Sequence, residues 1–436
     1  MHPTNDPSLR SFLEISSNSD FPIQNLPFGV FSKTAEDLHR IGVRIGDYVL
    51  DLHALSGEGW LSGEHIGNGD VFRRPVLNDF MALGKQAWEE ARTIISELLR
   101  EDNAKLRDDK AMREEVLLPI ADVQMHLPAS IGDYTDFYAS KYHATNVGTM
   151  FRGPDNALQP NYLHLPVGYH GRASSVVVSG TDLHRPMGQT IAPDADSPAF
   201  GPCKLLDYEL EVGVFVGTGN ELGSPMTISR ARDSIFGLVL MNDWSARDIQ
   251  KWEYVPLGPF LSKNFGTSIS PWIVSMTALE PFLVDGEAQD PEPLPYLKDN
   301  QPGGFNLHLE ALVQTERMAS PYRITQTNMK YLYWTIYQQL THHAVTGCNL
   351  RPGDLFGTGT VSGPSKESRA CLLELTWRGQ EPLDLPSGES RKFLLDGDRL
   401  IIKGWGQANG YNIGFGEVIG TILPAVESQA KAFQHP

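Results

Sequence analysis

Three carboxylates alternate with apolar residues in the segment 205–216. In an extended strand, successive side chains point to opposite faces, so Asp207, Glu209 and Glu211 would share one face. Residues two apart on such a face lie roughly 6–7 Å from each other. Each ionised pair then costs about 2–3 kcal/mol at an effective dielectric constant of about 20. A divalent cation with oxygen ligands would offset this repulsion. The alternative is a strand face that is simply solvated.

A further carboxylate stands at the end of another predicted strand. The apolar run 235–241 predicts a buried strand, and Asp243 follows it directly. Side chains at the end of a strand are commonly the ones presented for function. Asp243 is therefore a candidate ligand for an ion, and the alternative is that it caps the following turn.

Two basic residues and a glutamine follow Asp243 in the chain. Residues 245–248 resemble a capping box that opens a short helix, and that helix would carry Arg247 and Gln250 on one face. Lys263 follows in the Gly- and Pro-rich loop 258–267. Each basic residue also has an alternative interpretation as a solvated surface charge.

A histidine and two more carboxylates complete the candidate residues. Asp136 lies among aromatic residues in the segment 131–138, and His143 follows seven residues later. Glu374 stands in the apolar run 371–377, which predicts a strand, and an unpaired carboxylate buried there would be costly. A histidine partner is attractive, because a carboxylate fixes the imidazole tautomer and raises its basicity. The pair would form a general base able to activate water, whereas a lone His143 would have a structural role.

Several elements must position these residues. Short apolar runs alternate with turn signals over 22–54, and residues 44–49 predict a β-hairpin. A helix is expected from Asn78, which can cap it, because apolar residues recur at helical spacing as far as Leu98. The charged segment 100–115 predicts an exposed helical connector.

The sequence pattern after the connector is typical of strands. From residue 117 onward, short β-rich runs are punctuated by Gly and Pro, with a long loop at 281–305 and a helix at 328–343. The fold class is therefore expected to be mainly β, of the α+β type. We predict an N-terminal β domain with its connector over residues 1–120 and a β-rich catalytic domain over 121–436.

Composition narrows the class of protein. With 436 residues, of which 41% are hydrophobic, the chain can bury a large core. Its net charge of −17 argues against nucleic acid or an anionic membrane as partner. Three widely spaced cysteines indicate neither a disulfide framework nor a CxxC metal site. No apolar run is long enough to span a bilayer and no signal pattern begins the chain, so the cytoplasm is the expected compartment.

Familiar catalytic motifs are absent from the sequence. It has no GxSxG elbow, no HExxH and no P-loop, which excludes the common serine-hydrolase, zincin and nucleotide-binding classes. The segment 217–223 carries spaced glycines, but no convincing helix follows, and it predicts a turn.

Long runs resemble the fumarylacetoacetase family, which belongs to the wider fumarylacetoacetate hydrolase family. The resemblance extends through nearly the whole chain, and its runs lie at 20–27, 106–110, 133–138, 143–146, 165–172 and 241–250. Shorter members of the wider family lack the N-terminal unit, so agreement along the full length favours fumarylacetoacetase. The segment 356–360 departs from the family pattern.

The resemblance implies roles for particular residues. It implies a Ca²⁺ or Mg²⁺ ion held by Asp136, Glu209, Glu211 and Asp243, which leaves Asp207 outside the ligand set. His143 resembles a general base oriented by Glu374. Arg247, Gln250 and Lys263 resemble groups that stabilise developing negative charge. The substrate-contacting positions implied are Tyr138, Arg152, Tyr169, Gln250, Tyr254 and Thr360. Lys263 and Thr267 are further implied to border a second, structural cation site.

The resemblance also implies an activity and an architecture. The activity is hydrolysis of the carbon–carbon bond of 4-fumarylacetoacetate, a small β-diketo acid, to fumarate and acetoacetate, the last step of tyrosine and phenylalanine catabolism. The fold implied is a small SH3-like barrel followed by a mixed β-sandwich roll, and the active unit implied is a cytoplasmic homodimer. Two alternatives remain: a related acylpyruvate hydrolase or oxaloacetate decarboxylase, and a non-enzymatic calcium-binding β-module.

Overall fold

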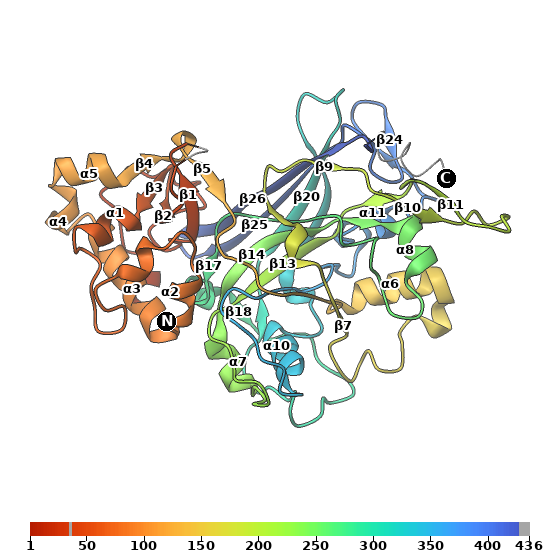
Figure 1. Cartoon of the computed structure of the whole chain (residues 1–436), viewed down its shortest axis with the longest axis horizontal. Helices are drawn as coiled ribbons and strands as arrows, with labels where there is room; N and C mark the ends of the chain where they lie inside the picture. Colours follow the sequence, from red (N-terminus) through yellow and green to blue (C-terminus); the bar gives the residue numbers. More distant parts are fainter. Residues whose placement is uncertain (35–36, 427–436) are drawn as a thin grey trace, which may run out of the picture.

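The computed structural model describes residues 1–34 and 37–426. Figure 1 shows a smaller N-terminal part, drawn in red and orange, beside a larger part built mostly of long strands. Strands dominate and helices are short, so the predicted mainly β (α+β) class is confirmed. The division of the chain into domains at residues 120 and 121 stays a prediction.

The N-terminal part is built on a five-stranded sheet with the order β4-β3-β2-β1-β5. Its strands are β1 (Phe28–Ser32), β2 (Arg40–Ile45), β3 (Tyr48–Asp51), β4 (Leu117–Pro119) and β5 (Gln124–His126). The hairpin predicted at 44–49 is confirmed, because Ile45 pairs with Tyr48 across a two-residue turn. Gly46 has a φ of 53° in this turn, a conformation that favours glycine.

Helices cover this sheet. They are α1 (Leu52–Gly57), α2 (Asn78–Ala82), α3 (Lys85–Leu99), α4 (Ala104–Arg107) and α5 (Lys110–Val116). The single helix predicted from Asn78 is wrong in two respects. It breaks at Gly84, whose φ is 90°, and the Asn78 amide donates to the carbonyls of Ser130 and Pro352 instead of capping a helix. The connector over 100–115 is helical, as expected.

A buried guanidinium joins α3 to the N-terminal segment. Arg92 is 1% exposed and donates to four acceptors: Thr4 Oγ1 at 2.7 Å, Asn25 O at 2.6 Å, Asn5 Oδ1 at 3.2 Å and Gln24 O. None of these acceptors is a carboxylate, and burial lowers the pKa of Arg92 to about 10. The charge is therefore satisfied by hydrogen bonds alone.

The N-terminal segment also reaches the larger part of the chain. The α-amino group of Met1 lies 3.0 Å from Glu280 Oε1, and the Asn5 amide donates to Thr277 O at 2.7 Å. The Asn25 amide donates to Gly414 O at 2.8 Å. The first 25 residues therefore tie the two parts together.

Replacing Arg92 by methionine is expected to lower the free energy of unfolding by about 3 kcal/mol or more, because four buried acceptors lose a charged donor. Urea unfolding followed by circular dichroism measures this change. The control is Arg74→Met, since the Arg74–Asp79 pair is 60% and 55% exposed and should contribute less than about 1 kcal/mol. Equal stability of the Arg92→Met and wild-type proteins would contradict this assignment.

The larger part contains an eight-stranded sheet with the order β7-β6-β22-β13-β14-β16-β8, in which β17 also pairs with β14. Its strands are β6 (Tyr134–Phe137), β7 (Gly168–His170), β8 (Val176–Val178), β13 (Leu210–Val216), β14 (Ile235–Asp243), β16 (Thr267–Ile269), β17 (Val274–Ser275) and β22 (Leu355–Gly357). Every residue of β13 and β14 is buried, which confirms the buried strand predicted at 235–241.

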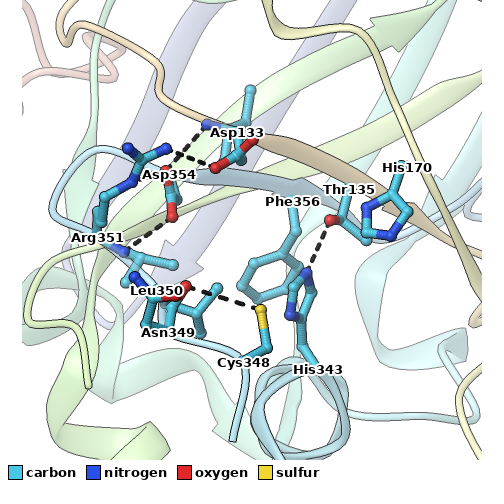
Figure 2. A pocket seen from close by; sticks show the side chains of 12 residues that line it. Asp133, Thr135, His170, His343, Cys348, Asn349, Leu350, Arg351, Asp354 and Phe356 are labelled. Atoms are coloured by element: carbon cyan, nitrogen blue, oxygen red, sulfur yellow. Dashed lines mark hydrogen bonds and ion pairs between the residues drawn. The ribbon is translucent and has the colours of Figure 1, made fainter. Parts of the chain in front are cut away.

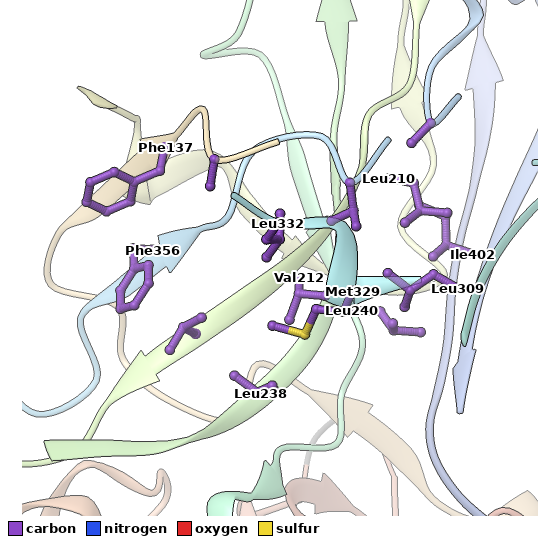
Figure 3. Packing of buried hydrophobic residues seen from close by; sticks show 14 of the residues in the cluster. Phe137, Leu210, Val212, Leu238, Leu240, Leu309, Met329, Leu332, Phe356 and Ile402 are labelled. Atoms are coloured by element: carbon purple, nitrogen blue, oxygen red, sulfur yellow. The ribbon is translucent and has the colours of Figure 1, made fainter. Parts of the chain in front are cut away.

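A second sheet of five strands packs against the first and has the order β21-β20-β25-β26-β9. Its strands are β9 (Leu183–His184), β20 (His308–Gln314), β21 (Tyr322–Asn328), β25 (Arg399–Ala408) and β26 (Tyr411–Leu423). Figure 3 shows Val212 of β13 and Leu240 of β14 meeting Leu309 of β20 and Ile402 of β25. The opposite face of β13 and β14 packs on the N-terminal part through Phe215 and other residues.

Short elements complete the larger part. The two-stranded pairs are β10 (Met187–Thr190) with β11 (Ala199–Pro202), β12 (Leu206–Asp207) with β15 (Ser245–Ala246), β18 (Leu283–Val284) with β19 (Gly304–Phe305), and β23 (Leu383–Asp384) with β24 (Ser390–Arg391). The helices are α6 (Lys141–Arg152), α7 (Ile228–Ser234), α8 (Arg247–Glu253), α9 (Met276–Leu279), α10 (Ile336–Ala344) and α11 (Leu372–Leu375). Single turns of 3-10 helix lie at Pro3–Asn5, Asp70–Arg73, Ile120–Asp122, Pro154–Asn156, Ala173–Ser175, Glu280–Phe282, Met329–Tyr331 and Lys366–Ser368.

Two predictions about these elements need correction. The helix expected at 328–343 is shorter, because α10 begins at Ile336, where Thr335 forms a capping box with Gln338. The strand expected at 205–216 is interrupted, since β12 pairs with β15 whereas β13 pairs with β14. The long loop predicted at 281–305 holds only the short pair β18 and β19 beyond its 3-10 turn.

Candidate active site

Four buried carboxylates meet in the eight-stranded sheet. Asp136 lies on β6, Glu211 on β13 and Asp243 at the end of β14, while Glu209 directly precedes β13. Each residue offers one oxygen, and these oxygens lie within 4.8 Å of one another. All four residues are buried, and none is more than 5% exposed.

Strand β22 lies between β6 and β13, and a glycine on it leaves space for the carboxylates of Asp136 and Glu211. Gly357 of β22 pairs with Asp136 on one side and with Gly213 on the other. A Cβ at position 357 would lie 2.7 Å from Asp136 Oδ1 and 2.7 Å from Glu211 Oε2, which is closer than real contacts allow. Gly357 is thus a site residue that the sequence indicated only as part of the departing segment 356–360.

Two oxygens of the cluster have no partner. Asp136 Oδ1 and Glu211 Oε1 are buried and accept no hydrogen bond from the residues that the structure describes. A buried acceptor without a partner is costly, and a group of carboxylate oxygens is the donor set that hard divalent cations prefer. The residues present therefore fit a Ca²⁺ or Mg²⁺ ion.

The pKa values of the cluster point the same way. Burial, and then the neighbouring carboxylates, raise the pKa of Asp136 and of Glu211 well above their ordinary values. Burial also raises the pKa of Asp243. For Glu209, burial is outweighed by Lys263 and Arg247, and its pKa is lowered. Part of the cluster is thus neutralised by basic side chains, and part needs a further positive charge to ionise.

Lys263 lies inside this cluster. It is 7% exposed, and its Nζ donates to Glu209 Oε2 and, at 2.6 Å, to Asp243 Oδ2. Although burial alone would lower the pKa of Lys263, Asp243 and Glu209 raise it. The alternative of a surface charge is therefore wrong. Thr267 Oγ1 donates to Asp243 Oδ1 at 3.2 Å and Tyr169 OH donates to Asp243 Oδ2 at 3.1 Å. A second cation site at Lys263 and Thr267 stays a prediction.

Arg247 is also buried, not solvated. Its Nη1 lies 2.7 Å from Glu209 Oε1 and its Nε donates to Asp207 Oδ2 at 2.8 Å. Nη1 also donates to Gln250 Oε1 at 3.2 Å, so the predicted pairing of Arg247 with Gln250 on one helix face is found. Arg247 Nη2 is buried and has no hydrogen-bond partner among the described residues. This nitrogen remains available to a ligand.

Two local expectations near Arg247 are wrong. Residues 245–248 do not form a capping box: Ser245 lies in β15 and its hydroxyl donates to Asp243 O, and the helix α8 begins at Arg247. Asp207 does not join Glu209 and Glu211 in the carboxylate cluster. The strand predicted to carry all three residues is interrupted between Asp207 and Leu210.

His143 and Glu374 are in contact. His143 Nδ1 lies 2.6 Å from Glu374 Oε2, and both residues are buried. His143 Nε2 lies 3.9 Å from Glu209 Oε1, so the free edge of the imidazole faces the carboxylate cluster. A carboxylate on Nδ1 favours the tautomer whose Nε2 can accept a proton. Glu374 lies in helix α11 and not in the strand predicted at 371–377.

Other side chains hold Glu374 in place. Asn146 Nδ2 donates to Glu374 Oε1 at 2.8 Å, Ser362 Oγ donates to Oε2 at 2.7 Å, and Cys371 Sγ lies 3.1 Å from Oε2. Burial would raise the pKa of Glu374, but His143 and these hydrogen bonds lower it to about 2. Sequence reasoning missed Asn146 and Ser362. Asn146 lies three residues after His143 in α6, and this helical spacing was the available signal.

The predicted substrate-contacting residues differ in burial and in their contacts with the site. The Tyr138 ring lies edge-on to His143 with centroids 5.2 Å apart. Thr360 is buried and its Oγ1 has no partner. Tyr254 directly follows α8 and is 43% exposed, and Arg152 ends α6, where it donates to the carbonyls of Asn156 and Ala157. Tyr138, Tyr169 and Gln250 therefore contact His143, Asp243 and Arg247 respectively.

A cavity of about 400 Å³ lies elsewhere in this part of the chain. Figure 2 shows Thr135, His170 and His343 at one side of it, with Cys348 beside His343, and Arg351 at the other side. None of the predicted site residues lines it. Thr135 neighbours Asp136 in β6, and successive side chains of a strand point to opposite faces. The cavity is therefore distinct from the carboxylate cluster.

Comparisons with known proteins cover most of the chain. Residues 134–422 match the family model described as fumarylacetoacetate (FAA) hydrolase C-terminal, and residues 24–128 match the one described as fumarylacetoacetase N-terminal. The chain is 57% identical to a fumarylacetoacetase from Bos taurus over 417 residues, covering 95% of this chain and 99% of that protein. It is also 57% identical to a fumarylacetoacetase from Homo sapiens over 423 residues, with the same coverage.

A solved structure supports the fold. The fumarylacetoacetate hydrolase from psychrophilic Exiguobacterium antarcticum superposes with a TM-score of 0.50 at 17% sequence identity, covering 92% of this chain and 99% of that one. At this identity the likeness bears on the fold alone.

Proposed function

The chain belongs to the fumarylacetoacetase family, and we propose that it hydrolyses 4-fumarylacetoacetate to fumarate and acetoacetate at the buried carboxylate cluster. It is a hydrolase, as more than half of the positions agree with curated fumarylacetoacetases over nearly the full length. The observation that carries the proposed site is that His143 contacts Glu374 through Nδ1 while Nε2 faces the cluster.

The substrate is a β-diketone with a carboxylate at each end, and its hydrolysis breaks a carbon–carbon bond. A carbanion is a poor leaving group, so water must be activated at one carbonyl while an enolate is stabilised at the other. In the proposed reaction, His143 Nε2 takes a proton from the water that attacks the ketone carbonyl of the fumaroyl group. This carbon becomes a carboxylate of fumarate when its bond to the neighbouring CH₂ carbon breaks, and acetoacetate leaves as the enolate. Glu374 holds the resulting imidazolium through Nδ1.

Basic and amide donors take the developing negative charge. We assign this role to Arg247, Lys263 and Gln250, because the first two are buried cations and fixed donors act more strongly in a buried site than in bulk water. Arg247 Nη2, which is buried without a partner, is one donor available to the leaving enolate. The proposed substrate-contacting residues are Tyr138, Arg152, Tyr169, Gln250, Tyr254 and Thr360.

Asp136, Glu209, Glu211 and Asp243 are the proposed ligands of the ion, either Ca²⁺ or Mg²⁺. When bound, such an ion supplies a Lewis acid that polarises the diketone oxygens. The chain's own contribution is to fix four buried carboxylates, two of which need a positive charge to ionise. Proton release should therefore accompany binding of the ion.

Removing the ion is expected to lower kcat by about 100-fold or more, because Lewis-acid catalysis contributes several kcal/mol. The assay follows the loss of the fumarylacetoacetate absorbance before and after chelation, and then after Ca²⁺ or Mg²⁺ is added separately. Recovery with one ion identifies it. Acylpyruvate and oxaloacetate serve as comparison substrates. A protein shown by elemental analysis to hold no metal, yet retaining full turnover, would contradict the metal assignment.

We further propose that the enzyme acts in the cytoplasm as a homodimer, in the last step of tyrosine and phenylalanine catabolism. The three cysteines are all free, as expected in a reducing compartment. Val255, Leu257 and Phe260 are 67%, 95% and 67% exposed, and such an apolar surface is typical of a protein contact. Among the described residues, no helix combines the length and apolar character needed to cross a membrane.

A further inference from the structure

Asp207 is a buried carboxylate that the proposed reaction does not use. It is 0% exposed and lies outside the four-carboxylate group. The sequence pattern grouped it with Glu209 and Glu211, but Asp207 belongs to β12, which is a separate strand from β13. A fully buried carboxylate needs compensating partners, so its contacts indicate what it does.

Four donors surround the Asp207 carboxylate. Oδ2 accepts from Arg247 Nε at 2.8 Å and from the backbone N–H of Leu373 at 3.0 Å. Oδ1 accepts from the backbone N–H of Leu372 at 2.7 Å and of Tyr208 at 2.9 Å. An ionised carboxylate offers about four acceptor positions, so these bonds leave no room for a metal ion or a substrate group.

The donors belong to two different parts of the active site. Leu372 and Leu373 are the first residues of α11, the helix that carries Glu374 and through it orients His143. Arg247 reaches from Asp207 to Glu209 at the carboxylate cluster. Asp207 is therefore the direct connection between the element behind the general base and the cation proposed to stabilise the enolate.

We propose that Asp207 is a positioning residue that holds Arg247 and α11 in fixed relation, so that the general base and the enolate-stabilising cation act on the same substrate. This inference rests on the proposed function. Asp207 touches neither the substrate nor the reacting atoms, and it acts through Arg247 and Glu374.

The change Asp207→Asn tests this with little change in shape. An asparagine amide keeps one acceptor oxygen and turns the other into an NH₂ group, which would face donors and could accept from none of them. Arg247 and α11 then lose their shared anchor. A displacement of about 1 Å in a catalytic group can lower the rate by about 100-fold. We therefore expect kcat to fall by about 30- to 100-fold while KM changes by less than about threefold.

A matched control exists in the N-terminal part. Asp51 is also 0% exposed, pairs with Arg40 Nη1 at 2.8 Å, and accepts from the backbone N–H of Ala54 at the start of α1. The change Asp51→Asn should reduce the melting temperature in the same way but leave kcat unchanged. A similar fall in kcat for both variants would show a structural effect only and would overturn the inference.

The experiment compares the purified wild-type, Asp207→Asn and Asp51→Asn proteins, at a temperature where circular dichroism shows each to be folded. Asp207→Asn with kcat within twofold of wild type, or with a change in KM alone, would overturn the inference and leave the proposed function standing. A wild-type protein without turnover of fumarylacetoacetate would overturn the proposed function and this inference with it.

The variant Asp207→Glu covers the case in which Asp207→Asn does not fold. It keeps the charge and the acceptors but adds one methylene, which displaces α11 or Arg247. We expect a fall in kcat of about fivefold or more with little change in KM, smaller than that of a folded Asp207→Asn. Wild-type kcat in a folded Asp207→Glu protein would overturn the inference.

Discussion

Replacing His143 by alanine is expected to lower kcat by about 10³-fold or more and to leave cation binding nearly intact. General-base catalysis contributes typically about 10²–10⁴-fold. His143 contacts Glu374 through one ring nitrogen and faces Glu209 with the other, at 3.9 Å. It is the described imidazole that combines a carboxylate partner with an edge turned to the carboxylate cluster. The measurement is kcat with fumarylacetoacetate, together with calorimetric titration with Ca²⁺ and with Mg²⁺.

The control for this prediction is His126→Gln. His126 bonds Ser32 Oγ at 2.7 Å and stacks on His39 in the N-terminal part, so its loss should not change kcat. Preserved turnover in the His143→Ala protein would remove the general-base assignment. Loss of cation binding together with turnover would mean that His143 supports the ion site and does not act as the base alone.

Lys263→Met has the second largest expected effect. Its ammonium group lies against Glu209 and Asp243. Without it, Glu209 keeps Arg247 as a basic partner, whereas Asp243 keeps the hydroxyl groups of Tyr169 and Thr267 and loses its ion pair. Breaking a buried ion pair on one side typically costs about 3–5 kcal/mol of stability. Loss of one fixed donor to the developing enolate should also lower kcat by about 10²-fold. Urea unfolding and steady-state kinetics measure the two effects.

Excess Ca²⁺ or Mg²⁺ should restore part of the stability of Lys263→Met, because a cation in the cluster neutralises the same carboxylates, but it should not restore kcat. Lys85→Met is the control: the Lys85–Asp233 pair is 52% and 58% exposed and should contribute about 1 kcal/mol or less. If Lys263→Met were as stable and as active as Lys85→Met, Lys263 would have neither role.

Local sequence pattern predicted two elements correctly: a continuous apolar run that is buried on both faces, and a hairpin with a short turn. The run 235–241 lies at the centre of the sheet and forms β14 as expected, and the hairpin at 44–49 depends only on its own turn. The segment 205–216 could not be predicted from local pattern alone. Its alternation is uniform, yet β12 and β13 pair with different partners, and that choice depends on residues far along the chain.

Short apolar runs are ambiguous between strand and helix. The run 371–377 predicts a strand, but Asp207 accepts from the N–H groups of Leu372 and Leu373, and this distant carboxylate supports the first turn of α11. Asn78 illustrates the same point, since it bonds carbonyls at Ser130 and Pro352 and caps nothing. Tertiary partners decided the outcome in both cases.

The candidate site was more predictable than the elements that carry it. Asp243 stood out because it follows an apolar run, whereas the sequence left Arg247 and Lys263 open as surface charges, and the family resemblance supplied their roles. In the structure Arg247 contacts Glu209, and Lys263 contacts Glu209 and Asp243. Gly357 could not be found in this way, because its role depends on the register of β22 against β6 and β13. A missing side chain leaves no signal in a single sequence until its neighbours are known.

The N-terminal segment bears on the order in which the molecule assembles during synthesis. Its first residues contact Thr277 and Glu280, and Asn25 contacts Gly414. Synthesis proceeds from the N-terminus, so residues 1–25 are made well before Thr277, Glu280 and Gly414, the residues that they contact. Such distant contacts close late, because loop closure costs entropy before the contact repays it. The contacts between the two parts are therefore expected to form only after residues 277, 280 and 414 have been synthesised.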